Sequence, residues 1–390
     1  MSREDVKSSI LTTLPLTVVY LLINFSAWLW YALFGKYLVL DLGFEGGALG
    51  AVMMLYNLSY AVSALPAGRF SDIIESKKIL LAGILIYSVG IFFMSRSLNF
   101  PSMAVSCIIA GVGEGVFFTS ATVYAVKKGG VRKVGMIYGF VLSSGLLGEV
   151  LGSLASGYTK EYFGGQALFL ISCLIALATS PLILFLKELP KTNGSRSSSM
   201  GLIRLLRSHK GFRLLALGLI FHGIGFNMIS PFISVHAGAL GLNDKSIGFV
   251  NFTWLLSTMI TTALWSILAD KIGGKLILAG HLIFSFASWA TYAHSWNFAT
   301  LIYAAVFLGI VSSMDMPSRR KLVAELESGQ GIGVLIGSLD LLTMLSSIPA
   351  PMLGGAIYQA AGVVTLFWIA SIINSIGVPF LLKVKAKRGL

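Results

Sequence analysis

The chain has 390 residues, of which 56% are hydrophobic and only 12% are charged. Soluble proteins of this size carry about 25% charged residues, so this composition excludes an ordinary soluble protein. The net charge of +13 does not indicate nucleic-acid binding, because the basic residues are confined to short gaps between apolar runs.

Twelve apolar runs follow one another along the chain, each about as long as the 20 residues that a bilayer-spanning helix needs. The first run begins near Ile10 and is too long for the core of a signal peptide, so we interpret it as a retained spanning helix. The predicted spans are 11–39, 46–67, 78–97, 101–126, 134–157, 165–187, 213–237, 245–268, 275–294, 297–317, 331–357 and 362–383. We therefore expect an all-α membrane protein with twelve transmembrane helices.

Lysine and arginine are strongly biased toward the gaps on one side of these spans. The gaps on the opposite side hold only Lys36, Arg96, Lys160 and Lys245. Because loops rich in Lys and Arg remain in the cytoplasm, both termini are expected to be cytoplasmic. The expected location is the cell membrane, with the lipid bilayer as a partner.

The longest gap divides the spans into six and six. Its polar segment 193–199 is typical of a flexible linker, and the apolar and basic pattern at 202–206 predicts a short helix on the membrane surface. The expected organisation is an N-terminal six-helix bundle over 1–187, a cytoplasmic linker over 188–212 and a C-terminal six-helix bundle over 213–390.

An internal repeat relates the two halves without gaps. Asp72 and Asp270 lie 198 positions apart. The same offset pairs Gly43 with Gly241, Gly50 with Gly248, Gly111 with Gly309, Gly135 with Gly333, Gly139 with Gly337 and Gly157 with Gly355. The pattern indicates a tandem duplication of a six-helix unit, an architecture that suits rocking of two halves about a central site.

Two copies of one loop carry a family resemblance. The segments 68–78 and 266–275 resemble the Gly-x-x-x-Asp-Arg-x-Gly-Arg-Arg signature of the major facilitator superfamily of secondary transporters, which the chain resembles over essentially its whole length. The first copy lacks the basic residue after Asp72 and the central glycine. The resemblance implies a latch at the cytoplasmic gate, formed by Asp72, Lys77, Asp270, Lys271 and Lys275. The alternative is that these are solvated loop charges.

Two further segments resemble family motifs. The small residues from Gly139 to Gly157 are similar to the antiporter pattern, with Ser153 in place of its proline. In the run 111–115, Glu114 matches the glutamate of a Gly-x-Gly-Glu motif in the spinster-like branch. Cys107 stands where many members have arginine, so the proton-coupling role of that arginine does not carry over.

Four carboxylates fall within the predicted spans: Glu114, Glu149, Asp315 and Asp340. Ionisable groups there cost about 2.5–3.5 kcal/mol on insertion scales and mark functional sites. No Lys or Arg lies deep in a span, so we expect them to be protonated, to pair with His222 or to face a wet cavity. Asp315, near a helix end, has the alternative of a local ion pair with Arg319. Glu114 is the predicted main proton-coupling group, with Asp340 or Glu149 as a second.

Aromatic and polar residues share helix faces that line the cavity in the resembling family. Asn24, Trp28 and Tyr31 lie on one face, and the repeat places His222 and Phe226 on the equivalent face. The residues expected to bind substrate are Asn24, Trp28, Tyr31, Tyr56, Tyr60, Glu114, Phe118, His222, Phe226, Asn251 and Trp254. Aromatic groups with a few polar ones are typical of sites for amphipathic ligands. For each aromatic, helix packing or lipid contact is the alternative.

An aromatic cavity with excess negative charge attracts cations. The expected function is therefore proton-coupled export of amphipathic or cationic organic compounds, by a monomeric antiporter that works by alternating access. The alternatives are a transporter of a specific metabolite, lipid-like or sugar-like, and a non-transporting receptor. No enzyme is expected, because the sequence shows no nucleophile–base pair, metal cluster or phosphate loop. No cofactor or metal site is expected either, and Cys107 and Cys173 are interpreted as small buried apolar residues.

Overall fold

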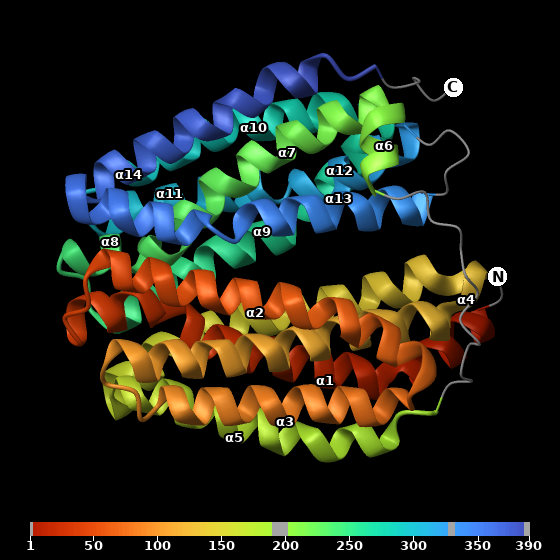
Figure 1. The fold of residues 1–390 in the computed structure, drawn as a ribbon, viewed down its shortest axis with the longest axis horizontal. Helices are drawn as coiled ribbons and strands as arrows, with labels where there is room; N and C mark the ends of the chain where they lie inside the picture. Colours follow the sequence, from red (N-terminus) through yellow and green to blue (C-terminus); the bar gives the residue numbers. More distant parts are fainter. Residues whose placement is uncertain (1–2, 189–201, 327–331, 386–390) are drawn as a thin grey trace. The chain divides into compact units, whose positions relative to one another are not determined.

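A computed structural model describes residues 3–188, 202–326 and 332–385 of the chain. The regular elements in these ranges are helices, and the described residues form no β-strand (Figure 1). The first half contains α1 (Arg3–Lys36), a π-helical turn (Tyr37–Asp41), α2 (Gly46–Ile73), α3 (Ser76–Met94), α4 (Phe100–Phe163), α5 (Gly165–Thr179) and a 3-10 segment (Ser180–Phe185). The second half contains α6 (Leu202–Ser208), α7 (Lys210–Ile229), a 3-10 turn (Ser230–Phe232), α8 (Ile233–Ala239), α9 (Asp244–Ile272), α10 (Gly274–Ala293), α11 (Phe298–Ser312), α12 (Asp315–Leu326), α13 (Ile332–Ser347) and α14 (Ala350–Leu382).

Eleven segments of the described chain are long and apolar enough to cross a membrane. Two of them, Phe100–Gly129 and Met136–Phe163, belong to α4. The last, Leu335–Leu382, is 48 residues long and is interrupted at Gly362, where φ is 78°. It therefore holds the two runs predicted at 331–357 and 362–383. The prediction of an all-α membrane protein is confirmed.

The chain forms two compact units, and each unit includes a short segment from the other half of the sequence. The N-terminal unit comprises 1–37, 55–195 and 243–252, and the C-terminal unit comprises 38–54, 196–242 and 253–390. The first residues of α2 thus belong to the C-terminal unit, and the first residues of α9 belong to the N-terminal unit. The predicted division at 188–212 stays a prediction, since 189–201 lie outside the described residues.

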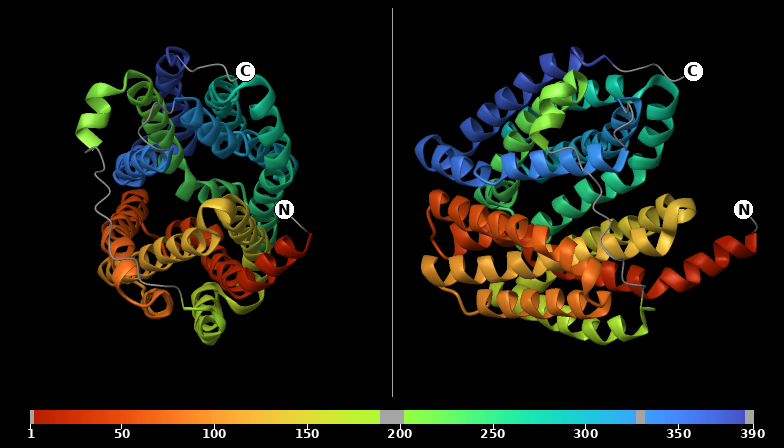
Figure 2. Two further views of the ribbon diagram at one scale, coloured as in Figure 1. Left: turned by 90° about the vertical axis from the view of Figure 1, so that its right-hand side faces the viewer. Right: turned by 45° about the vertical axis from the view of Figure 1, so that its right-hand side comes forward.

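In the N-terminal unit, α1 and α3 each pack against both α4 and α5. The two views of Figure 2 show these helices running side by side. Trp30 of α1 and Tyr87 of α3 lie in the core, each about 1% exposed, and the Trp30 indole nitrogen donates a hydrogen bond of 3.0 Å to the Tyr87 hydroxyl. A buried indole is favourable only when its N–H has such a partner.

In the C-terminal unit, α7 packs against α13 and α14, and α10 packs against α11, α12 and α14. Leucines of α7, α10, α12 and α13 form a core that also includes Leu205 of α6. The short helix predicted at 202–206 is confirmed as α6.

The repeat extends to the turns. Gly43 and Gly241, which are 198 positions apart, have φ of 73° and 80°, and Gly164 and Gly362 have φ of 84° and 78°. Glycine is the residue that adopts such angles without steric cost. Asn99 and Asn297 likewise each cap a helix, by accepting a hydrogen bond from the backbone N–H three residues later. The same offset therefore relates local structure as well as sequence.

Candidate functional site

Glu114 lies in the first span of α4, between glycines that fix its direction. A Cβ on Gly111 or Gly115 would collide with the backbone of α2, and a Cβ on Gly113 would collide with the backbone of α3. Small residues permit such close backbone approach in membranes. Because α2 and α3 occupy these faces, the half-buried Glu114 side chain points toward α1 and the second span of α4.

Glu149, in the second span of α4, faces the same region. A Cβ on Gly148 or Gly152 would meet the backbone of α1, so α1 and this span are in close contact. The Trp28 indole of α1 hydrogen-bonds the Glu149 carboxylate. Glu149 is also close enough to Glu114 for the two carboxyl groups to interact electrostatically.

Several aromatic side chains interact with these two carboxyl groups or with one another. Tyr20 of α1 interacts electrostatically with both of them and with the hydroxyls of Tyr60 and Tyr138. The Tyr20 ring also lies edge-on to Phe118, with 5.2 Å between ring centroids. The structure thus brings the predicted residues Trp28, Tyr60, Phe118, Glu114 and Glu149 together, and Tyr31 contacts Trp28 at a centroid distance of 5.2 Å. We call Glu114, Glu149, Tyr20, Tyr60, Tyr138, Trp28 and Phe118 the carboxylate–aromatic cluster.

Other predicted binding residues of the N-terminal unit take part in helix packing. Asn24 is 6% exposed and donates a 2.7 Å hydrogen bond to the Tyr20 carbonyl in its own helix. Tyr56 is 7% exposed, with its ring 5.7 Å from that of Trp30. Asn251 is buried and donates a 3.1 Å hydrogen bond to the Ala32 carbonyl. These contacts show a packing role for each.

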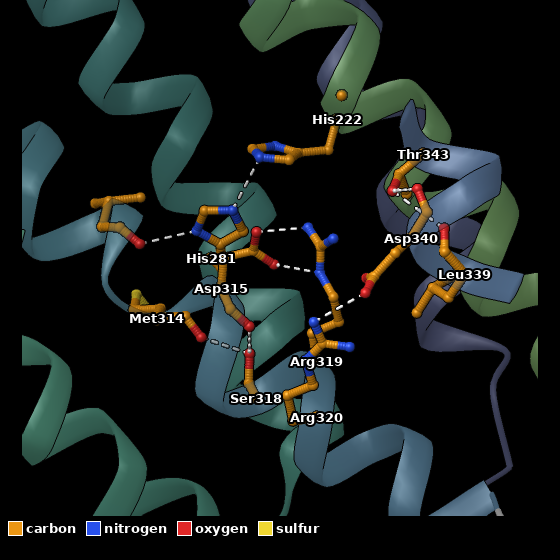
Figure 3. Close-up of polar contacts among 12 residues, drawn as sticks. His222, His281, Met314, Asp315, Ser318, Arg319, Arg320, Leu339, Asp340 and Thr343 are labelled. Carbon is orange, nitrogen blue, oxygen red and sulfur yellow. Dashed lines mark hydrogen bonds and ion pairs between the residues drawn. The ribbon is translucent and has the colours of Figure 1, made fainter. Parts of the chain in front are cut away.

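A second polar cluster lies in the C-terminal unit (Figure 3). His222 of α7 and His281 of α10 face each other, with 3.2 Å between their Nε2 atoms. The Nδ1 atom of His281 lies 2.8 Å from the Val311 carbonyl, and that of His222 lies 2.9 Å from Oδ1 of Asn374. The donor atoms of His222, His281 and Asp315 lie within 4.8 Å of one another, so these residues could hold a metal ion.

Arginines accompany the two remaining predicted carboxylates. Arg319 lies one helical turn after Asp315 and donates two hydrogen bonds to its carboxylate, of 3.1 and 2.5 Å. This confirms the alternative of a local ion pair for Asp315. Asp340 of α13 pairs with Arg320 of α12 at 2.9 Å, whereas the sequence predicted no basic partner for it. The partner is provided by α12, the helix that directly precedes α13.

His222 contacts Phe226, one of the two aromatic residues predicted in this unit. Its ring stacks on Phe226 at 6.4 Å and on Trp289 at 5.8 Å between centroids. Phe226 in turn contacts Trp254 at 6.1 Å, and the Trp254 indole nitrogen lies 3.4 Å from the Ser312 hydroxyl. The structure therefore brings His222, Phe226 and Trp254 together.

The predicted gating residues lie at the ends of helices. Asp270 of α9 pairs with Lys321 of α12 at 3.1 Å, and Lys77 donates to the Leu184 carbonyl at 3.1 Å. Lys271 is exposed and Lys275 is half-buried, while the Asp72 side chain lies outside the described residues.

Glutamates that the sequence did not single out hold two helix N-termini near these loops. Glu188 accepts a hydrogen bond from the Ser76 amide at 2.9 Å, and Glu325 accepts one from the Gly274 amide at 3.1 Å. Carboxylates are stabilised at the positive end of a helix dipole. Ser76 and Gly274 are 198 positions apart and are therefore equivalent in the repeat. Each has its amide bound by a glutamate, although Glu188 and Glu325 are not themselves equivalent in the repeat.

His281 and Asn374 are the main site residues that sequence reasoning missed. Both lie inside apolar runs. At the 198-residue offset, His281 corresponds to Gly83 and Asn374 corresponds to Ala176, so each is a polar residue where the other half has a small one. Tyr20 was missed as well, although it lies one turn before Asn24 on the predicted cavity face. A comparison of the halves position by position would have identified all three.

Comparisons with known proteins agree with this architecture. The family model of the Major Facilitator Superfamily matches residues 16–215 and 215–389. A multi-drug resistance efflux pump PmrA homolog of Lactococcus lactis subsp. lactis (strain IL1403) is 25% identical over 352 residues, or 84% of this chain and 86% of that protein. The quinolone resistance protein NorA of Staphylococcus aureus is 31% identical over 137 residues, which is 35% of each chain.

Crystal structures of transporters share the fold. A bacterial homolog of the human lysosomal transporter Spinster, in an inward-facing and unoccupied conformation, superposes with a TM-score of 0.81 at 12% identity, over 98% of this chain and 99% of that one. The nucleoside transporter NupG gives a TM-score of 0.79 at 14% identity, over 96% and 100% of the two chains. At such low identities the likeness concerns the fold alone.

Proposed function

The chain belongs to the major facilitator superfamily as a multi-pass secondary transporter of the cell membrane, and we propose that it exports amphipathic or cationic organic compounds in exchange for protons. Both termini are cytoplasmic in this proposal, and the protein acts as a monomer by alternating access. The coupling site is the carboxylate–aromatic cluster of the N-terminal unit.

The observation that carries the proposal is the pair formed by Glu114 and Glu149. They interact with each other, and neither lies at ion-pair distance from a Lys or Arg that the structure describes. Two neighbouring carboxylates in a poorly solvated site repel each other, so the pair favours holding a proton. An organic cation that enters the cluster offers a replacement charge, and the proton can then leave.

The surroundings of the pair suit that exchange. Trp28, Tyr60 and Phe118 offer aromatic faces, and a cation over such a face gains about 0.5–2 kcal/mol, more where water is excluded. The Trp28 indole, which hydrogen-bonds Glu149, positions the carboxylate next to those rings. Competition between proton and cation for one site couples their movements in opposite directions.

Asp315 and Asp340 are secondary candidates in this proposal, because each already has an arginine partner. Two of the relatives support export of drug-like compounds, since one is named a multi-drug resistance efflux pump homolog and the other a quinolone resistance protein. We also propose that five residues at helix ends contribute to gating: Asp72, Lys77, Asp270, Lys271 and Lys275.

The test is transport by the purified protein in proteoliposomes with an imposed pH gradient. We expect accumulation of cationic dyes against their gradient, and we expect Glu114→Gln to abolish that accumulation. Glu75→Gln is the matched control, since the Glu75 side chain is 40% exposed and pairs with Lys78 one turn away; it should transport like the wild type.

The substrate panel also contains a lysolipid, a sugar and an uncharged analogue of the dye. Movement of neutral or anionic compounds alone would exclude cation export and favour the metabolite transporter. Binding without flux would favour the receptor.

A further inference from the structure

The hydrogen bonds of His222 and His281 determine which nitrogen of each ring carries its proton. The Val311 carbonyl can only accept, so Nδ1 of His281 must donate to it. Asn374 uses its amide nitrogen to donate to the Leu282 carbonyl at 2.7 Å, which leaves Oδ1 as the acceptor for Nδ1 of His222. Both neutral rings therefore carry their proton on Nδ1.

The consequence is that two bare Nε2 atoms face each other at 3.2 Å. Their lone pairs repel unless a positive ion lies between them. Both rings are deeply buried, with 8% exposure for His222 and 2% for His281, and burial disfavours a charged imidazolium. Two imidazoles bound to one tetrahedral Zn²⁺ at about 2.0–2.1 Å hold their nitrogens roughly 3.3 Å apart, close to the separation found here.

The surroundings match those of known metal-ligating histidines. Such histidines donate their other ring N–H to a carbonyl or carboxylate, which fixes the tautomer and the ring orientation. Both rings do so here. Asp315 adds a carboxylate within 4.8 Å of the two nitrogens. Arg319 uses one position on each Asp315 oxygen, and a carboxylate offers about four acceptor positions, so the carboxylate retains capacity for a metal ion.

We propose that His222, His281 and Asp315 bind a divalent transition-metal ion, with Zn²⁺ as its representative. The ion joins α7, α10 and the first residue of α12, and water completes its coordination. Two imidazoles with one carboxylate suit zinc and its first-row neighbours, whereas Mg²⁺ and Ca²⁺ prefer oxygen ligands. This site is separate from the carboxylate–aromatic cluster and does not depend on the proposed export function.

The experiment measures binding of Zn²⁺ alone to the full-length protein in detergent, purified through a tag without histidines. Calorimetry should show one saturable site, and the affinity should fall by at least about tenfold in His222→Gln and in His281→Gln. His294→Gln, which removes an exposed histidine outside the cluster, is the matched control and should bind like the wild type. A Cys107→Ser/Cys173→Ser variant should also bind normally.

A second measurement needs no variant and so remains informative if a histidine variant fails to fold. Co²⁺ bound to the wild type should give the visible absorption of a low-coordinate site with nitrogen and oxygen ligands, and Zn²⁺ should displace it. Absence of a saturable site would overturn the proposal, as would a sulfur-ligand spectrum or unchanged affinity in folded His281→Gln. A site that takes up only a proton between the two rings would overturn it too.

Discussion

Gly113→Ala is expected to destabilise the protein, because it adds a methyl group where α3 and α4 touch. The new Cβ would lie 2.5 Å from Tyr87 Cα and 2.8 Å from the Gly83 carbonyl oxygen, whereas ordinary contacts begin at 3.4 Å. Both neighbours are backbone atoms, which cannot rotate away. The Tyr87 backbone nitrogen would lie closer still. The helices must therefore separate by more than about 0.9 Å, and overpacking of this kind costs about 1–3 kcal/mol.

Thermal unfolding of the full-length protein in detergent measures this effect, at about 2–4 °C for each kcal/mol in a unit of this size. Gly139→Ala in the same helix is the matched control, since a Cβ there meets nothing within 4 Å. Alanine is favoured over glycine within a helix by about 0.5–1 kcal/mol, so the control should melt at or slightly above the wild-type temperature. Equal melting temperatures for the two variants would refute the close approach of α3 and α4.

Ion pairs of different burial provide three further predictions, each measured by the same unfolding assay. Asp315→Asn leaves Arg319 without its carboxylate in a site where both side chains are less than 20% exposed, and should cost about 3–5 kcal/mol; an additional Arg319→Gln should recover part of that loss, and no recovery would contradict the pairing. Asp244→Asn removes the carboxylate that contacts two lysines at 2.6 and 2.7 Å, and a loss below about 1 kcal/mol would show that this bridge does not form in solution. Lys321→Ala should change stability by less than about 1 kcal/mol, because its partner Asp270 is 73% exposed, and a larger loss would contradict the exposed geometry.

Spans and repeats were predictable because they depend on local patterns. A run of about 20 apolar residues specifies a spanning helix without reference to its neighbours. The 198-residue offset likewise predicted equivalent turns. Gly43 and Gly241, which it pairs, both have a positive φ. The last apolar stretch contains α13, α14 and their loop, and its break at Gly362 lies where the sequence predicted the boundary between the last two spans.

Contacts between helices were harder to predict from the sequence. Helical periodicity indicates the helix face on which a residue lies, but it does not indicate which other helix packs against that face. Glu114 and Glu149 were each predicted as functional, yet only the packing of α4 on itself and on α1 brings them together. Asp340 looked unpartnered, although Arg320 lies only 20 residues earlier in the chain. His281 was hidden in an apolar run, where a single histidine carries no signal of the ring that it faces.

The central claim is that Glu114 and Glu149 couple substrate movement to protons. It is tested most directly by two assays on one Glu114→Gln/Glu149→Gln variant in proteoliposomes, with a cationic dye as substrate. Counterflow exchange needs no net proton movement, whereas accumulation driven by a pH gradient does. The account predicts that exchange persists while gradient-driven accumulation is lost. Gradient-driven accumulation at the wild-type level in this variant would contradict it.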